Sequence, residues 1–111
     1  MTAWIPKQGD LVGLDFDPQA GHEQKGRRPA LVVSKEAFNK GTGTAICCPI
    51  TNTDWKMPFH VPIAGRTSLT GFVMCEQMKS LDFRSRGMKL IEQAPRDVLE
   101  DVLSIIDASV F

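Results

Sequence analysis

Short apolar segments separated by turn residues follow one another closely from residue 11 to residue 91. Residues 11–16 are bounded by turn residues on both sides, which is typical of a strand. Residues 30–33 form a continuous apolar run, as expected of a central strand that is buried on both faces. Further strands are expected at residues 44–48, 59–61, 69–74, 76–83 and 88–91. So many short strands at close intervals predict a closed or nearly closed antiparallel β-barrel.

The last part of the chain changes from a strand period to a helical one. Apolar residues fall on one stripe of a helix over residues 95–109: Val98, Leu99, Val102, Leu103, Ile105 and Ile106. Acidic residues lie on the opposite face, Pro95 fits a first turn, and Asp97 complements the positive end of the helix. A second, brief helical turn is expected at residues 35–38, capped by Ser34. The predicted fold class is therefore α+β, a small barrel with a C-terminal amphipathic helix packed on it.

Length and composition limit the class of protein. With 111 residues, the chain is expected to form a single domain over residues 1–111. No segment approaches the ~20 apolar residues that span a bilayer, and the first residues lack the apolar core of a signal peptide. We expect a cytoplasmic protein that does not associate with a membrane.

The three cysteines are Cys47, Cys48 and Cys75. Two of them are adjacent, so their side chains point to opposite faces of a strand and are poorly placed to bridge or to share a metal. An odd number without ligand spacing predicts buried or half-buried free thiols in a reducing compartment. Neither a metal site nor a cofactor is expected.

The formal net charge is zero, which by itself argues against nucleic-acid binding. The charges are nevertheless unevenly distributed, with one basic cluster at Lys25, Arg27 and Arg28 and acidic residues concentrated near the C-terminus. A second basic cluster comprises Lys79, Arg84, Arg86 and Lys89. A neutral chain can still present a basic groove on one face. The alternative is scattered charge that only keeps the protein soluble.

The segment from residue 21 to residue 34 carries the strongest functional signal. A charged stretch bracketed by Gly21 and Gly26 leads into the basic pair Arg27-Arg28, and then directly into the apolar strand. This order places a carboxylate and a guanidinium on a loop anchored by rigid sheet, an arrangement suited to work on a phosphate. Together with the upstream motifs Gly-Asp-Leu-Val and Asp-Phe-Asp-Pro, at residues 9–12 and 15–18, the segment resembles the MazF/PemK family of bacterial toxins.

The resemblance is dense over residues 9–34, looser at residues 48–52 and 76–80, and fades after about residue 87. It implies an SH3-like barrel of the CcdB/PemK kind, with a long C-terminal helix. It also implies a homodimeric toxin of a type II toxin-antitoxin system that inhibits translation. Such a toxin cleaves single-stranded RNA at specific sequences without a metal, leaving a 2′,3′-cyclic phosphate and a 5′-hydroxyl. The implied protein partner is a cognate antitoxin whose acidic tail covers the basic groove.

Three positions match the catalytic residues of the family: Arg28, Thr51 and Glu23. Cleavage by the substrate's own 2′-hydroxyl requires a base, an acid and positive charge near the phosphorane. A guanidinium is better suited to hold phosphate oxygens than to exchange protons, so Arg28 is expected to act as an electrostatic clamp. Glu23 is the better intrinsic base, and Thr51 can donate to a non-bridging oxygen.

Other residues are expected to bind the RNA: Lys25, Arg27, Asn52, Trp55, Gln77, Lys79 and Ser80. Trp55 is expected either to stack on an unpaired base or to pack against the barrel or a partner subunit. His22 and His60 are interpreted as bystanders, His60 as a structural residue. Gly13 departs from the family, whose members often carry a bulky residue there, and this weakens any inference about the bases read nearby.

Two other functions remain as alternatives. CcdB-type toxins share the fold and bind DNA gyrase as protein ligands, but they depend on a Trp-Gly-Ile end, whereas this chain ends Ser109-Val110-Phe111. A non-catalytic RNA-binding barrel is the second alternative. Retention of Glu23, Arg28 and Thr51 argues against it.

Overall fold

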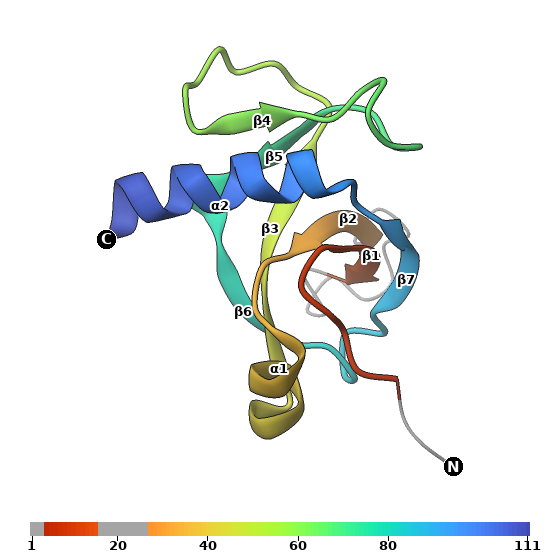
Figure 1. Ribbon diagram of the computed structural model, residues 1–111. Coiled ribbons are helices and arrows are strands. Elements are labelled where there is room, and N and C mark those ends of the chain that lie inside the picture. Colours follow the sequence, from red (N-terminus) through yellow and green to blue (C-terminus); the bar gives the residue numbers. More distant parts are fainter. Residues whose placement is uncertain (1–3, 16–26) are drawn as a thin grey trace.

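The structure is a computed structural model that describes residues 4–15 and 27–111. Its strands are β1 (Asp10–Asp15), β2 (Arg27–Val32), β3 (Thr44–Thr51), β4 (His60–Pro62), β5 (Phe72–Met74), β6 (Lys79–Asp82) and β7 (Lys89–Gln93). Its helices are α1 (Glu36–Thr42), the 3-10 turn η3 (Cys75–Gln77) and the long C-terminal α2 (Arg96–Val110). Figure 1 shows α2 crossing the sheet beside β4 and β5, with α1 at the opposite end.

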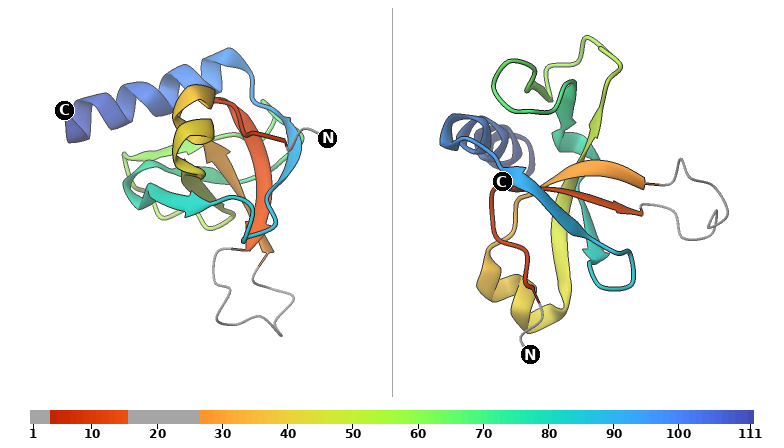
Figure 2. Two further views of the ribbon diagram at one scale, coloured as in Figure 1. Left: turned by 90° about the horizontal axis from the view of Figure 1, so that it is seen from below. Right: turned by 90° about the vertical axis from the view of Figure 1, so that its right-hand side faces the viewer.

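The strands that the structure describes form one antiparallel sheet in the order β4-β5-β3-β2-β1-β7, with β6 paired to the first half of β3. β3 is the central element, because its first half pairs with β6 and its last two residues, Ile50 and Thr51, pair with β5. The sheet curls strongly, as the two views of Figure 2 show, but the described hydrogen-bond ladder stays open between β4 and β7. The α+β fold with a C-terminal helix is confirmed.

Three local predictions require correction. The strand expected at residues 69–74 begins only at Phe72, because Gly71 takes a φ of +102° that interrupts extended backbone. The strand expected at residues 76–83 is divided, since Cys75–Gln77 forms a 3-10 turn before β6. The first helix begins one residue later than predicted and reaches Thr42, with Lys35 rather than Ser34 at its N-cap.

Ser34 has a different role from the predicted cap. Its hydroxyl lies 2.5 Å from Oδ1 of Asn39 and accepts a hydrogen bond from the Ile46 amide at 2.8 Å. The buried Asn39 side chain in turn donates to the carbonyl of Pro6 at 2.8 Å. The Ser34 side chain therefore joins α1 to β3.

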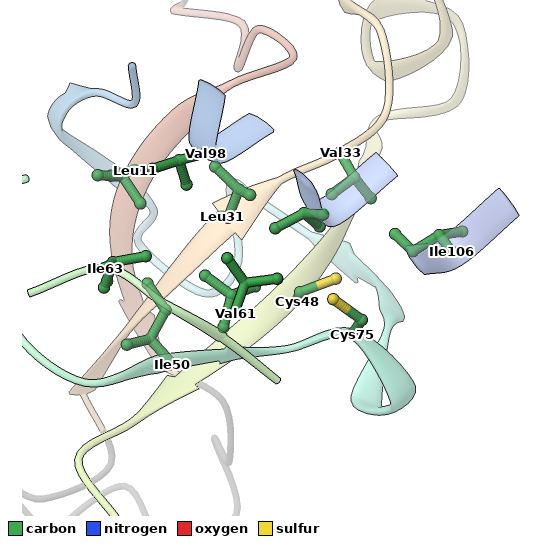
Figure 3. Packing of buried hydrophobic residues seen from close by; sticks show 12 residues of the cluster. Leu11, Leu31, Val33, Cys48, Ile50, Val61, Ile63, Cys75, Val98 and Ile106 are labelled. Atoms are coloured by element: carbon green, nitrogen blue, oxygen red, sulfur yellow. The ribbon is translucent and has the colours of Figure 1, made fainter. Parts of the chain in front are cut away.

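The core consists of two buried clusters on opposite faces of the sheet. One lies under α2, where Val98 and Ile106 pack against strand residues that include Leu11 and Leu31 (Figure 3). Val102 of α2 belongs to the same cluster. The other cluster includes Val12, Val32 and Cys47, whose side chains point to the opposite face of the same strands. The helix stripe predicted from the sequence is thus the face that α2 buries, and it closes the first cluster.

The cysteines divide between these clusters. Cys48 lies under α2 and Cys47 lies in the opposite cluster, as expected for neighbours on one strand. All three thiols are free and buried, as predicted. Burial raises the pKa of Cys47 to about 12 and that of Cys75 to about 11, and it also raises the pKa of Cys48. The thiols therefore stay protonated near neutral pH and cannot act as nucleophiles.

Candidate active site

Arg28 and Thr51 come from adjacent strands and lie at the same end of the sheet. Leu14 of β1 lies opposite Arg28. On the other side of β2, the last residue pair that β2 forms with β3 is Ala30 opposite Pro49. Arg28 precedes Ala30 by two residues and Thr51 follows Pro49 by two residues, so both lie just beyond the last paired residues of β2 and β3. Because the two strands are antiparallel neighbours, a guanidinium and a hydroxyl that are far apart in the sequence lie at the same end of adjacent strands.

Arg28 is available for an external ligand. The residue is exposed near the start of β2, and no residue in the described part of the chain accepts a hydrogen bond from its guanidinium. A guanidinium offers several donors in a fixed fork that matches two oxygens of one phosphate. The strand anchors its backbone, so the chemistry here suits a phosphate clamp.

Thr51 is half-buried, and its backbone is tightly held. Its hydroxyl accepts a hydrogen bond from the Thr53 amide at 3.2 Å. None of the described residues accepts a hydrogen bond from this hydroxyl. Gly71 lies so close that an added Cβ would come within 2.2 Å of the Thr51 carbonyl oxygen. Only glycine fits at this contact. The packing therefore fixes the position from which the Thr51 hydroxyl can donate.

Asn52 and Trp55 lie beyond Thr51. Oδ1 of Asn52 accepts a hydrogen bond from the Thr70 hydroxyl at 2.8 Å, which ties this segment to the residues before β5. The Trp55 side chain is 59% exposed. Packing of Trp55 against its own barrel, one of the two alternatives, is therefore not what the structure shows. Stacking on a base and contact with a partner subunit remain.

Arg27 has several intramolecular contacts. Its Nη2 donates to the carbonyls of Gly13 at 3.2 Å and Gly87 at 2.7 Å, and its Nη1 lies 3.8 Å from Oδ1 of Asp15. These contacts join β1 to the turn that precedes β7. The sequence suggested only an RNA contact for Arg27, and a structural role was missed because it depends on residues 60 positions apart.

The residues expected to bind RNA around β6 are spread along the sheet. Gln77 is exposed, in the 3-10 turn rather than in a strand. Lys79 lies opposite Cys47, four positions from Thr51 along β3, which corresponds to ~13 Å. The Ser80 hydroxyl donates to Oγ1 of Thr44 at 3.0 Å. Lys79 is therefore the group of this set best placed for a phosphate further along the strand.

Two predicted site residues, Glu23 and Lys25, lie outside the described residues, as does His22. The other histidine, His60, has a side chain only 3% exposed, and its Nε2 lies 2.9 Å from Oε2 of Glu76. This packing agrees with the interpretation of His60 as a structural residue.

A pocket of about 370 Å³ lies beside Arg28. Its lining residues are Gly13, Arg27, Arg28, Pro29, Leu69, Lys89 and Ile91. Leu69 and Ile91 could not be predicted as site residues from the sequence, because the pocket exists only once β1, β2 and β7 are side by side. The sequence feature that could have pointed to this pocket is the apolar pair Leu90-Ile91 in β7. Both side chains are exposed in the structure.

Comparison with known protein families identifies the chain. Residues 7–110 match the family described as PemK-like, MazF-like toxin of type II toxin-antitoxin system. The chain belongs to this family.

Curated members of the PemK/MazF family are similar over most of their length. The endoribonuclease toxin MazF of Escherichia coli K12 is 39% identical over 87 residues, which cover 78% of each chain. The endoribonuclease toxin ChpB of the same strain is 38% identical over 109 residues, which cover 94% of this chain and 93% of ChpB.

Solved structures of PemK/MazF proteins share the fold. The crystal structure of MazF from Deinococcus radiodurans has a TM-score of 0.84 and 42% identity, covering 96% of each chain. MazF in a MazE-MazF crystal structure from the same organism has a TM-score of 0.82 and 36% identity, covering 96% of this chain and 95% of that chain.

Two further structural findings concern ligands and membranes. Within the described residues there is no group of three or more His, Cys, Asp or Glu side chains that could hold a metal ion. None of the described helices has the length and apolar character needed to cross a membrane.

Proposed function

We propose that this member of the PemK/MazF family is an endoribonuclease toxin that acts as one domain in the cytoplasm. Its substrate would be single-stranded mRNA, cleaved at specific sequences so that translation stops. The observation that carries the proposal is the position of Arg28 and Thr51 at the same end of the adjacent strands β2 and β3. Both groups lack a protein partner for the hydrogens that a phosphate would accept, within the residues described.

The proposed reaction uses the substrate's own 2′-hydroxyl as the nucleophile. Its oxygen bonds to phosphorus while the bond from phosphorus to the 5′-oxygen breaks. Glu23 takes the 2′-proton, the leaving 5′-oxygen takes up a proton, and the products are a 2′,3′-cyclic phosphate and a 5′-hydroxyl. Arg28 and Thr51 would hold the non-bridging oxygens, where negative charge develops in the transition state. Because the RNA supplies the nucleophile and Arg28 the positive charge, this chemistry does not require a metal ion.

The remaining predicted RNA-binding residues would hold the strand on either side of the scissile phosphate. Trp55 presents an exposed indole on which a base can stack. Lys79, which lies opposite Cys47, would bind a phosphate several residues along β3, and the exposed Gln77 would contact the RNA nearby. Lys25, Arg27, Asn52 and Ser80 complete the proposed set.

We propose that two copies of the chain associate as a homodimer. Exposed apolar side chains gather where the C-terminal end of α2 meets the segment before β4, with Phe59 39% exposed and Val110 58% exposed. A pocket of about 380 Å³ lies in this region and is lined by Pro58, Phe59, Ile105, Ala108 and Ser109. Contiguous exposed apolar surface is typical of an interface. Light scattering should give about twice the chain mass of 12.3 kDa, and a monomer mass at micromolar concentration would refute the dimer.

The protein partner proposed is an antitoxin. Crystal structures of MazE-MazF from Deinococcus radiodurans, 36% identical to this chain, are among the similar structures. Carboxylates on an acidic tail can replace RNA phosphates opposite Arg28 and Lys79, so such a tail would block the site by charge complementarity.

Incubation of the purified protein with a long RNA of mixed sequence in EDTA tests the proposed activity. We expect discrete fragments with 2′,3′-cyclic phosphate ends, clustered at one short sequence. Intact RNA, from protein shown to be folded, would reject the nuclease and favour a toxin directed at a protein target.

A further inference from the structure

The pocket beside Arg28 is more apolar than the proposed catalytic pair, Arg28 and Thr51. Its walls are largely apolar, with Pro29, Leu69 and Ile91 around Gly13, whereas its rim carries Arg28 and Lys89. We propose that this pocket holds one nucleobase of the RNA, next to the phosphate held by Arg28, and that it determines which sequence is cut. The proposal rests on the proposed function and names a specificity site within it.

Three strands form the base of the pocket. Gly13 of β1 lies between Pro29 of β2 and Lys89 of β7, because both are its register partners. Gly13 has no side chain, and a Cβ built there would lie 3.7 Å from Cδ1 of Ile91, an ordinary contact distance. Open space thus stands above Gly13, and the exposed Ile91 side chain borders it. A side chain at position 13 would start at an ordinary contact distance from Ile91 and occupy part of this space.

Hydrogen bonds of neighbouring residues hold in place the wall of the pocket that Leu69 forms. The Ser68 amide donates to Oε1 of Glu92 at 3.2 Å, and the Ser68 hydroxyl bonds to the same carboxylate oxygen. The Leu69 amide donates to the Thr67 hydroxyl at 3.0 Å. Nearby, Arg66 bonds to Asp101 of α2 at 2.8 Å. These contacts position the wall before a ligand arrives, so binding loses less conformational entropy.

Size and charge together favour a nucleotide as the occupant. The volume of about 370 Å³ is at the lower end of the ~300–1,000 Å³ that small-molecule sites occupy. Apolar walls suit the faces of an unpaired base, while cations at the rim suit the phosphates that flank it. In the described part of the chain neither Arg28 nor Lys89 has an ion-pair partner. An apolar side chain of a protein ligand would use the walls but not both cations.

Binding of uncleavable RNA tests the pocket independently of catalysis. The probe is a fluorescent oligonucleotide carrying the mapped cleavage sequence with 2′-O-methyl sugars, together with a series in which each base near the scissile phosphate is removed in turn. For the unmodified protein, we expect one abasic position to weaken binding by about tenfold or more. For Gly13→Val, binding should already be weaker, and removal of that same base should have no further effect.

Gly41→Ala is the matched control, because Gly41 is an exposed glycine in α1, away from the site, and no atom lies within 4 Å of where its Cβ would stand. It should bind every probe as the unmodified protein does. An abasic profile that is the same in Gly13→Val and in the unmodified protein would overturn the pocket proposal. Binding that is weakened by no single base removal would also overturn the pocket proposal. Base-dependent binding that disappears in Gly13→Val, together with normal cleavage by Arg28→Ala, would support the pocket and reject only the proposed catalytic role of Arg28.

Discussion

Replacing Arg28 by alanine is expected to lower the rate of RNA cleavage by about 10²–10³-fold, as when one donor to a developing oxyanion is lost. The change removes the forked donor that would hold the non-bridging phosphate oxygens. Because the side chain is exposed and has no described protein partner, the free energy of unfolding should change by less than ~0.5 kcal/mol. Single-turnover cleavage of a mapped oligonucleotide and urea unfolding measure the two quantities.

Two further variants make the Arg28 result specific. Arg28→Lys keeps the charge but loses the fork, so its rate should lie between those of the alanine variant and the unmodified protein. Arg96→Ala removes an exposed arginine from α2, whose Nη1 lies 3.5 Å from Glu100, and should cleave at the normal rate. Arg28→Ala with unchanged cleavage would show that the scissile phosphate lies elsewhere.

Replacing Gly71 by alanine is expected to lower the free energy of unfolding by about 2–4 kcal/mol and to reduce cleavage of RNA in the molecules that remain folded. The φ of +102° disfavours any side chain, and the new methyl group would meet the Thr51 carbonyl oxygen at 2.2 Å. The Thr51 backbone would have to move, and with it the hydroxyl. Urea unfolding and single-turnover cleavage, below the unfolding transition, report the two effects separately.

Gly65→Ala separates the contact from the backbone conformation. Gly65 also has a positive φ, +78°, but no atom lies within 4 Å of its Cβ position. Gly65→Ala should lower the free energy of unfolding by only ~1–2 kcal/mol, because only the backbone conformation is disfavoured, and it should cleave RNA at the normal rate. If both alanine variants have the same stability and activity, the close contact of Gly71 with Thr51 does not position the hydroxyl.

Most of the fold could be predicted because its signals are local. The apolar run at residues 30–33 lies largely within β2, and the stripe containing Val98, Val102 and Ile106 became the buried face of α2. Turn residues marked most strand ends. The divided strand at residues 75–82 was missed, since a single 3-10 turn has no period of its own in the sequence.

The site was less accessible to sequence reasoning. Arg28 and Thr51 could be named from the family resemblance, but their position at the same end of adjacent strands follows from the pairing of β2 with β3. The structural contacts of Arg27 and the pocket above Gly13 both depend on β7 lying beside β1. Such long-range neighbours leave no periodic mark in the sequence, so they could be found only from the arrangement of the strands.

Replacement of one 2′-hydroxyl in the RNA tests the central claim most directly. Two oligonucleotides of the mapped sequence, one with a single 2′-deoxy sugar on the 5′ side of the scissile phosphate, would be incubated with the protein in EDTA. The account predicts cleavage of the all-ribose strand to a cyclic phosphate and no cleavage of the other, although both bind equally. Equal cleavage of the two strands would show that the nucleophile is not the 2′-hydroxyl and would contradict the proposed mechanism.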